Sequence, residues 1–258
     1  MVTITLDGKP TEARDGATVL EVAREAGVDI PSLCHHEALG PYGACRLCLV
    51  EAEGPTLRRS LVTACTLQAS NGLSVDTGSA AVRRARKVVL ELLLGRCRTS
   101  ETLRAMARRH GVEGTRFGAG VEEDPCVRCG LCVRVCRDKI GTSAIAFASR
   151  GQHRRVTAEF GKPSDLCVGC GSCAAICPTG AIRAEDVGDE RTIVLKDRVI
   201  ARFTMVRCGA CGAPFATRKL LDAVATRVRE LPEADVELDC PGCRRVRRAE
   251  ALAGEVPA

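Results

Sequence analysis

The sequence predicts an α+β chain of several small domains rather than one large core. Its 258 residues include 17 cysteines, which form four tight groups and leave Cys97 alone. Strand, turn and helix signals follow one another at the N-terminus, and a cysteine pattern is repeated in the second half of the chain. Disulfide frameworks are typical of short secreted chains with spread cysteines, so these groups indicate metal ligation.

Residues 1–78 are predicted to form a small mixed domain. Its start, VTITL, alternates between apolar and polar residues like a strand, and Asp7-Gly8 predicts a hairpin turn into a second strand. An apolar stripe over residues 19–26 predicts a helix, which Gly27 ends.

The same domain is predicted to close with a hairpin. Asn71-Gly72 is a strong turn signal, and it lies between the strand-like residues 61–67 and 73–75. Two strands, a helix, a cysteine loop and closing strands in this order indicate a β-grasp arrangement.

Residues 79–124 are predicted to form two helices and a linker. Ser79 caps the first helix and Ser100 the second, and a glycine ends each of them. The glycine-rich residues 112–124 predict the linker. One side of the first helix is expected to be a solvated basic face, made of Arg83, Arg84, Arg86 and Lys87.

Residues 125–190 contain the strongest signal, a C-x2-C-x2-C-x3-C run that occurs twice. This spacing is typical of bacterial two-cluster ferredoxins, in which the fourth cysteine of each run binds the other [4Fe-4S] cluster. Two zinc ions are the alternative, and the spacing favours iron. Arg137 stands where such a run usually has proline. If the two runs exchange their fourth cysteines in this way, one cluster is bound by Cys126, Cys129, Cys132 and Cys177, and the second by Cys136, Cys167, Cys170 and Cys173.

The N-terminal group predicts a [2Fe-2S] cluster on Cys34, Cys45, Cys48 and Cys65. Plant-type ferredoxins use three closely spaced cysteines and a distant fourth, whereas here ten residues separate the first two ligands. His35 and His36 follow the first cysteine. Because four cysteines already complete the site, neither histidine is predicted as a ligand.

The ten-residue gap between the first two ligands and the segments IPSLCHHE and GACRLCLVE resemble the N-terminal domain of the large iron–sulfur subunit of respiratory complex I. The same domain begins the iron–sulfur subunits of NAD-linked and electron-bifurcating hydrogenases and of related formate dehydrogenases. The resemblance covers about residues 1–186 and implies a β-grasp fold. Such relatives usually hold a further [4Fe-4S] cluster on one histidine and three cysteines. That cluster is expected to be absent, because Cys97 and His110 are the only cysteine and histidine between Cys65 and Cys126. Cys97 is expected to be a buried apolar side chain.

Residues 191–258 are predicted to form a strand hairpin around residues 196–198 and a zinc-ribbon-like domain. A helix is expected over about residues 216–231, and the last residues are expected to fray. Two C-x2-C pairs, each on a knuckle turn, suit zinc, although a rubredoxin-like iron site has the same ligands. The segment MVRCGACGAPF also resembles the tail of ferredoxin-like subunits in formate hydrogenlyase, which implies a structural or docking role. The four metal ligands are Cys208, Cys211, Cys240 and Cys243.

Composition excludes several classes of protein. The formal net charge of +6 alone would suggest nucleic-acid binding. Each metal site held by four thiolates carries about −2, however, so four such sites bring the net charge of the loaded chain to about −2. Five Phe, one Tyr and no Trp are too few for stacking on bases. The start lacks signal-peptide features, and no apolar run reaches the roughly 20 residues of a membrane span. A cytoplasmic protein without a direct membrane span is expected.

The predicted function is electron transfer within a larger oxidoreductase. No nucleotide-binding glycine loop, activated nucleophile or hydrogenase catalytic domain is found, so no catalytic site of its own is expected. The resemblance implies a flavin partner subunit that carries FMN and handles NAD(P)H, together with a catalytic partner acting on hydrogen, formate, soluble ferredoxin or another low-potential substrate. A free multicluster ferredoxin is the alternative, and an iron–sulfur regulator or adaptor is a third.

Overall fold

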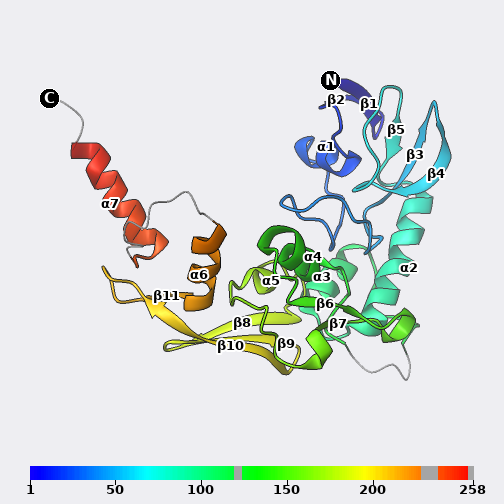
Figure 1. Cartoon of the computed structure of the whole chain (residues 1–258). Coiled ribbons are helices and arrows are strands. Elements are labelled where there is room, and N and C mark those ends of the chain that lie inside the picture. Colours follow the sequence, from blue (N-terminus) through cyan, green and yellow to red (C-terminus); the bar gives the residue numbers. More distant parts are fainter. Residues whose placement is uncertain (119–123, 228–237, 255–258) are drawn as a thin grey trace. The chain divides into compact units, whose positions relative to one another are not determined.

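The computed structural model describes residues 1–118, 124–227 and 238–254. Figure 1 shows the helices and strands along the chain. The chain divides into two compact units. The first comprises Met1–Arg134 and Ile176–Ala181, and the second comprises Val135–Ala175 and Ile182–Ala258. The boundary after Arg134 divides the first cysteine run, and the return of Ile176–Ala181 to the first unit divides the second run, so each run contributes residues to both units.

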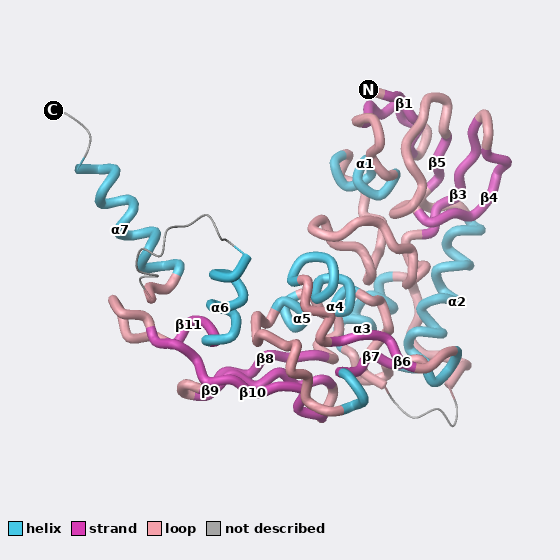
Figure 2. Tube along the Cα trace, viewed as in Figure 1, coloured by secondary structure: helices cyan, strands magenta, loops and turns pink. Residues whose placement is uncertain are grey.

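A five-stranded mixed sheet forms the core of the first unit (Figure 2). The order is β2-β1-β5-β3-β4, with β1 antiparallel to β2 and parallel to β5. The predicted turn between the first two strands is confirmed, since Asp7 and Gly8 have φ values of 48° and 79°. The strands are β1 (Val2–Leu6), β2 (Lys9–Ala13), β3 (Leu49–Gly54), β4 (Leu57–Thr63) and β5 (Ser74–Asp76).

The predicted closing hairpin is wrong. β5 does not pair with β4; it lies between β1 and β3, and the real hairpin joins β3 to β4. Asn71 and Gly72 do reverse the chain, and the Asn71 Oδ1 accepts a hydrogen bond from the Thr3 N–H at 2.8 Å. A turn signal locates a reversal but leaves the partner strand open, and here burial of Leu73 and Val75 in the core selects β1 and β3.

Helix α1 (Val19–Glu25) packs its apolar residues into this core. Thr18 and Glu21 form a capping box, in which each side chain accepts a hydrogen bond from the other residue's backbone N–H. The same cluster includes Cys48 and Cys65, which are 0% and 1% exposed. Two residues of the first cysteine group are therefore part of the hydrophobic core.

The two predicted helices after the sheet are confirmed as α2 (Ala80–Arg96) and α3 (Glu101–Arg109). Ser79 and Ser100 are their N-caps. The prediction of a fully solvated basic face on α2 is wrong at Arg86, which is 6% exposed. Its position, four residues from both Val82 and Leu90, puts it on the buried stripe of the helix.

The second unit contains a four-stranded antiparallel sheet of order β11-β10-β9-β8 and a separate pair, β6 and β7. The predicted hairpin is confirmed, with Lys196 at a φ of 58° in its turn. Strand β8 had no sequence signal, because five of its six residues are exposed and do not alternate. The strands are β6 (Ile145–Ala148), β7 (Arg155–Ala158), β8 (Ile182–Val187), β9 (Glu190–Leu195), β10 (Arg198–Arg207) and β11 (Pro214–Thr217).

The remaining helices flank the later cysteine groups. They are α4 (Leu131–Arg134), which continues as a π-helical turn over Val135–Ile140, then α5 (Ser172–Ala175), α6 (Arg218–Arg227) and α7 (Pro241–Gly254). Short 3-10 turns cover Gly151–His153 and Glu159–Gly161. Helix α6 begins near its predicted start. Its predicted end beyond residue 227, residues 119–123 of the predicted linker and the last four residues lie outside the described residues. No helix in the described parts of the chain is long and apolar enough to cross a membrane.

Candidate metal centres

The first cysteine group comes together in the first unit. Cys34, Cys45, Cys48 and Cys65 are each at most 5% exposed. Their thiols lie close enough to shift one another's pKa, Cys34 with Cys45, Cys48 with Cys65, and Cys65 with Cys34. The Cys34 thiol and then burial raise the pKa of Cys45, whereas Cys65 lowers the pKa of Cys48. Four adjacent sulfurs in a dry site match the donor set of an iron–sulfur cluster.

Backbone donors point at these sulfurs. The Leu33 N–H donates to the Cys45 Sγ at 3.4 Å, and the Cys45 N–H donates to the Cys34 Sγ at the same distance. The loop is shaped by Gly43, whose φ is 69° and where a Cβ would come 3.2 Å from the Thr66 Cγ2. Such N–H donors stabilise negative charge on ligating sulfur and so influence a cluster's reduction potential.

Both histidines beside Cys34 have other partners. The His35 Nδ1 lies 3.0 Å from the Arg24 guanidinium, and the His36 Nδ1 accepts a hydrogen bond from the Ala38 N–H at 3.1 Å. Burial lowers the pKa of His35, and the nearby Arg24 lowers it further, so the neutral ring is favoured. These contacts use the Nδ1 atoms without involving the sulfurs.

The second group in the first unit combines three cysteines of the first run with Cys177 of the second run. Cys126, Cys129 and Cys132 are buried, and Cys177 belongs to the returning segment Ile176–Ala181. Burial, together with the thiols of Cys126, Cys177 and Cys34, raises the pKa of Cys129 to about 12, although a hydrogen bond from the Leu131 N–H acts in the opposite direction. The Arg128 N–H donates to the Cys126 Sγ at 3.4 Å.

The fourth cysteine of the first run belongs to the second unit, with three cysteines of the second run. Cys136, Cys167, Cys170 and Cys173 line one small cavity. Burial, and to a smaller extent the charges of the other three thiols, raises the pKa of Cys173 to about 12. The cavity wall is otherwise mainly apolar and includes Ile140, Ala144, Ile145, Val168, Ile193 and Ile200. An apolar wall limits access of water to whatever the thiols hold.

The two runs have the same backbone shape. Arg128 and Gly169, at equivalent positions, have φ values of 56° and 69°, and the glycine after the next cysteine is also left-handed in both runs. A Cβ at Gly169 would lie 2.6 Å from the Thr217 Cγ2 and 2.7 Å from the Phe203 ring, so this position in the second run admits only glycine without rearrangement.

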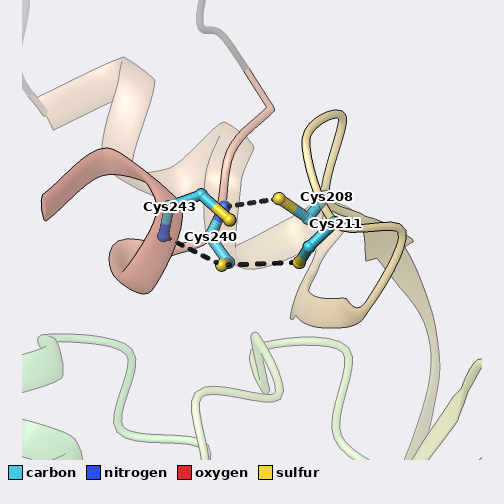
Figure 3. A group of neighbouring side chains, drawn as sticks. All are labelled: Cys208, Cys211, Cys240 and Cys243. Atoms are coloured by element: carbon cyan, nitrogen blue, oxygen red, sulfur yellow. Dashed lines mark hydrogen bonds between the residues drawn. The ribbon is translucent and has the colours of Figure 1, made fainter. Parts of the chain in front are cut away.

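The last four cysteines form a compact group (Figure 3). The ligand atoms of Cys208, Cys211, Cys240 and Cys243 all lie within 4.8 Å of one another, and a tetrahedral zinc–thiolate site places sulfurs about 3.8 Å apart. The Cys240 N–H donates to the Cys208 Sγ at 3.2 Å. Donors from Cys240 and Cys211 lower the pKa of Cys208 to about 6, which favours the thiolate that metals bind.

Only the first of these pairs lies on the predicted knuckle turn. The Cys208 N–H donates to the Ala213 carbonyl oxygen at 2.9 Å, and Gly212 turns the chain with a φ of 72°. The prediction of a second knuckle is wrong, because Cys243 lies in the first turn of α7, just after Cys240. The helix start supplies the Cys243 N–H, which donates to the Cys240 Sγ at 3.4 Å.

We expect Cys211→Ser to remove one zinc ion per chain and to leave the iron content unchanged. Cys211 is the exposed ligand, so serine fits there without disturbing a core, whereas it binds zinc poorly. Elemental analysis of the purified protein measures both metals. Cys97→Ser is the matched control, since it removes a thiol outside the four groups and should keep the zinc. Loss of iron instead of zinc from Cys211→Ser would identify a rubredoxin-like site.

Cys97 itself is buried, as predicted. It is 0% exposed at the end of α2, and its Sγ donates to the Asp124 carbonyl oxygen at 2.7 Å.

Two buried arginines near the cysteine groups were not predicted from the sequence. Arg86 donates to the Leu49 carbonyl oxygen, next to Cys48. Arg134, 7% exposed, lies between two cysteines of the first run; it donates to the Gly40 carbonyl oxygen and stacks on the Tyr42 ring at 4.8 Å. Hydropathy patterns treat arginine as a surface residue, so they offered no signal for either.

Known protein families match the parts of the chain that contain the first three sets of cysteines. Residues 1–80 match a family described as a 2Fe-2S iron-sulfur cluster binding domain. Residues 119–184 and 166–216 match two families, each described as a 4Fe-4S dicluster domain.

Individual proteins of known function are also similar to this chain. A subunit of NADH-quinone oxidoreductase from Rickettsia felis is 29% identical over 212 residues, covering 72% of this chain and 30% of that protein. The NADP-reducing hydrogenase subunit HndD of Solidesulfovibrio fructosivorans is 32% identical over 216 residues, covering 70% and 36%. A chain of an NAD+-reducing [NiFe]-hydrogenase, solved in the H2-reduced state, superposes with a TM-score of 0.60 at 33% identity, covering 69% of this chain and 85% of that one. This chain thus spans about a third of the length of its curated relatives.

Proposed function

This chain belongs to the family of iron–sulfur subunits found in NADH-quinone oxidoreductase and in NAD+-reducing [NiFe]-hydrogenase, and from that membership we propose that it relays electrons inside an NAD(P)H-linked oxidoreductase. It is an iron–sulfur electron-transfer subunit with one 2Fe-2S domain and a 4Fe-4S dicluster region. The larger enzyme and its reaction are the proposed part.

The observation that carries the proposal is the grouping of twelve cysteines into three largely buried sets. We assign the [2Fe-2S] cluster to Cys34, Cys45, Cys48 and Cys65 in a domain of β-grasp type, which the mixed sheet and α1 support. One [4Fe-4S] cluster is assigned to Cys126, Cys129, Cys132 and Cys177. The other is assigned to Cys136, Cys167, Cys170 and Cys173. The division of the chain supports this exchange, because each set of four falls within one unit.

When bound, each cluster supplies a centre that takes up and releases one electron. The chain's own residues hold the sulfurs, donate hydrogen bonds to them and surround them with apolar side chains. Cys34 and Cys129 belong to different sets, and the charge of Cys34 contributes to raising the pKa of Cys129. Such proximity within the first unit supports direct electron passage between the [2Fe-2S] site and the first [4Fe-4S] site.

Two kinds of partner are proposed. One is a flavin subunit that carries FMN and exchanges electrons with NAD(P)H, and the other is a catalytic subunit such as a hydrogenase or formate dehydrogenase. The names of the relatives, an NADH-quinone oxidoreductase, an NADP-reducing hydrogenase and an NAD+-reducing hydrogenase, support the nicotinamide link. The C-terminal group is proposed to hold zinc in a zinc-ribbon-like domain that serves structure or docking.

The test is anaerobic isolation of the tagged full chain from its own cells, with identification of every co-purifying chain and cofactor. We expect a flavin subunit and a catalytic subunit in fixed ratio with this chain, and about ten iron atoms per chain. Isolation of the loaded protein alone would reject the fixed-subunit role and favour a free multicluster ferredoxin.

A further inference from the structure

Arg86 is a buried cation beside the first cysteine group. It lies on the inward stripe of α2 between Val82 and Leu90, and only 6% of it is exposed. One guanidinium nitrogen donates to the Leu49 carbonyl oxygen at 2.7 Å. Leu49 directly follows Cys48, so this hydrogen bond holds the guanidinium against the backbone that carries a cluster ligand.

This cation has no carboxylate counter-ion among the described residues. No aspartate or glutamate in the described part of the chain forms an ion pair with Arg86, and its Nε is buried without a hydrogen-bond partner. Burial lowers the pKa of Arg86, and the nearby Cys48, Asp29 and Asp7 offset this only in part. Burying an unpaired charge is costly, so a compensating negative charge is expected close by.

An iron–sulfur cluster on the first cysteine group supplies that charge. Four thiolates and an oxidised [2Fe-2S] core carry about −2 in total, and reduction by one electron makes this about −3. A fixed positive charge nearby therefore stabilises the reduced state more than the oxidised state. In a site that excludes water this preference is weakly screened.

We propose that Arg86 is the counter-ion of the [2Fe-2S] cluster and that its charge raises the reduction potential of that cluster. The proposal rests on the assignment of Cys34, Cys45, Cys48 and Cys65 as the ligands. The electron comes from an external reductant, remains on the cluster and requires no proton, because Arg86 is charged throughout. Arg86 thus makes the cluster a better electron acceptor.

The test is a redox titration of the full-length holoprotein with dithionite, in which electron paramagnetic resonance follows the reduced [2Fe-2S] signal. Arg86→Gln keeps a donor for the Leu49 carbonyl oxygen but removes the charge, so its signal should develop at a lower potential. Arg86→Lys should keep a potential close to that of the wild type. Arg84→Gln removes an exposed charge from the same helix, and its potential should not move.

An unchanged potential in loaded Arg86→Gln protein would overturn the role of Arg86 while leaving the ligand assignment intact. A shift of equal size in Arg84→Gln would overturn it too, because the effect would then be general. If Arg86→Gln fails to load the cluster, Arg86→Lys decides: native loading and potential support the counter-ion, and failure of both variants rejects it. Absence of the [2Fe-2S] signal from the wild type would instead reject the ligand assignment together with this proposal.

Discussion

Cys177→Ser is expected to abolish the signal of the [4Fe-4S] cluster bound by the first cysteine run, although Cys177 ends the second run. Cys177 lies in the returning segment Ile176–Ala181 and, with Cys126, raises the pKa of Cys129. Serine is a poor ligand for this iron, so the cluster should lose between one iron atom and about four. Cys136→Ser should abolish the signal of the other cluster.

Electron paramagnetic resonance of the reduced holoprotein, with iron analysis, identifies the cluster affected. Cys129→Ser and Cys177→Ser should remove the same signal, and combining them should remove nothing further, because both act on one centre. Cys170→Ser is the matched control for the second centre and should have the same effect as Cys136→Ser. Loss of the same signal from Cys177→Ser and Cys170→Ser would contradict the exchange and assign each run its own cluster.

Cys48→Ser is expected to remove the [2Fe-2S] cluster completely and to unfold the sheet that surrounds it. Cys48 and Cys65 belong to the same hydrophobic core as Leu20 and Val50, so the cluster and the core depend on one another. Small domains of this size draw much of their folding free energy from bound metal. The variant should lose about two iron atoms per chain and become rapidly cleaved by protease between residues 1 and 76.

Two controls separate the loss of a ligand from the loss of packing. Leu20→Ala leaves every cysteine in place and should cost about 2–5 kcal/mol of stability by creating a cavity, while the reduced [2Fe-2S] signal remains at low temperature. Cys97→Ser removes a buried thiol and should keep all signals. A Cys48→Ser protein that resists protease as the wild type does would show that the sheet folds without its cluster.

The local elements of the fold were predictable because each depends on neighbouring residues. Asp7-Gly8 favours a left-handed backbone at both positions, and Ser79 and Ser100 accept the hydrogen bonds that begin α2 and α3. The spacing of the cysteines likewise predicted the classes of iron–sulfur domain that the families match.

The predictions from sequence were wrong or incomplete where a strand's pairing depends on residues distant in the sequence. The Asn71-Gly72 turn was found, yet β5 pairs with β1 and β3, a position in which Leu73 and Val75 are buried in the core. Strand β8 carries an exposed and non-alternating sequence, and its hydrogen bonds to β9 make it a strand. Neither choice is visible in a short window of sequence.

By itself the sequence determined that this chain is an iron–sulfur protein, because thiolate spacing is a local property that suits few metal centres. The tertiary structure decided which cysteines share a unit and where α2 carries Arg86, because both depend on how distant segments pack. Burial turned an apparently solvated arginine into an unpaired cation beside Cys48. The charge around a redox site is set by packing, and hydropathy along the chain does not report it.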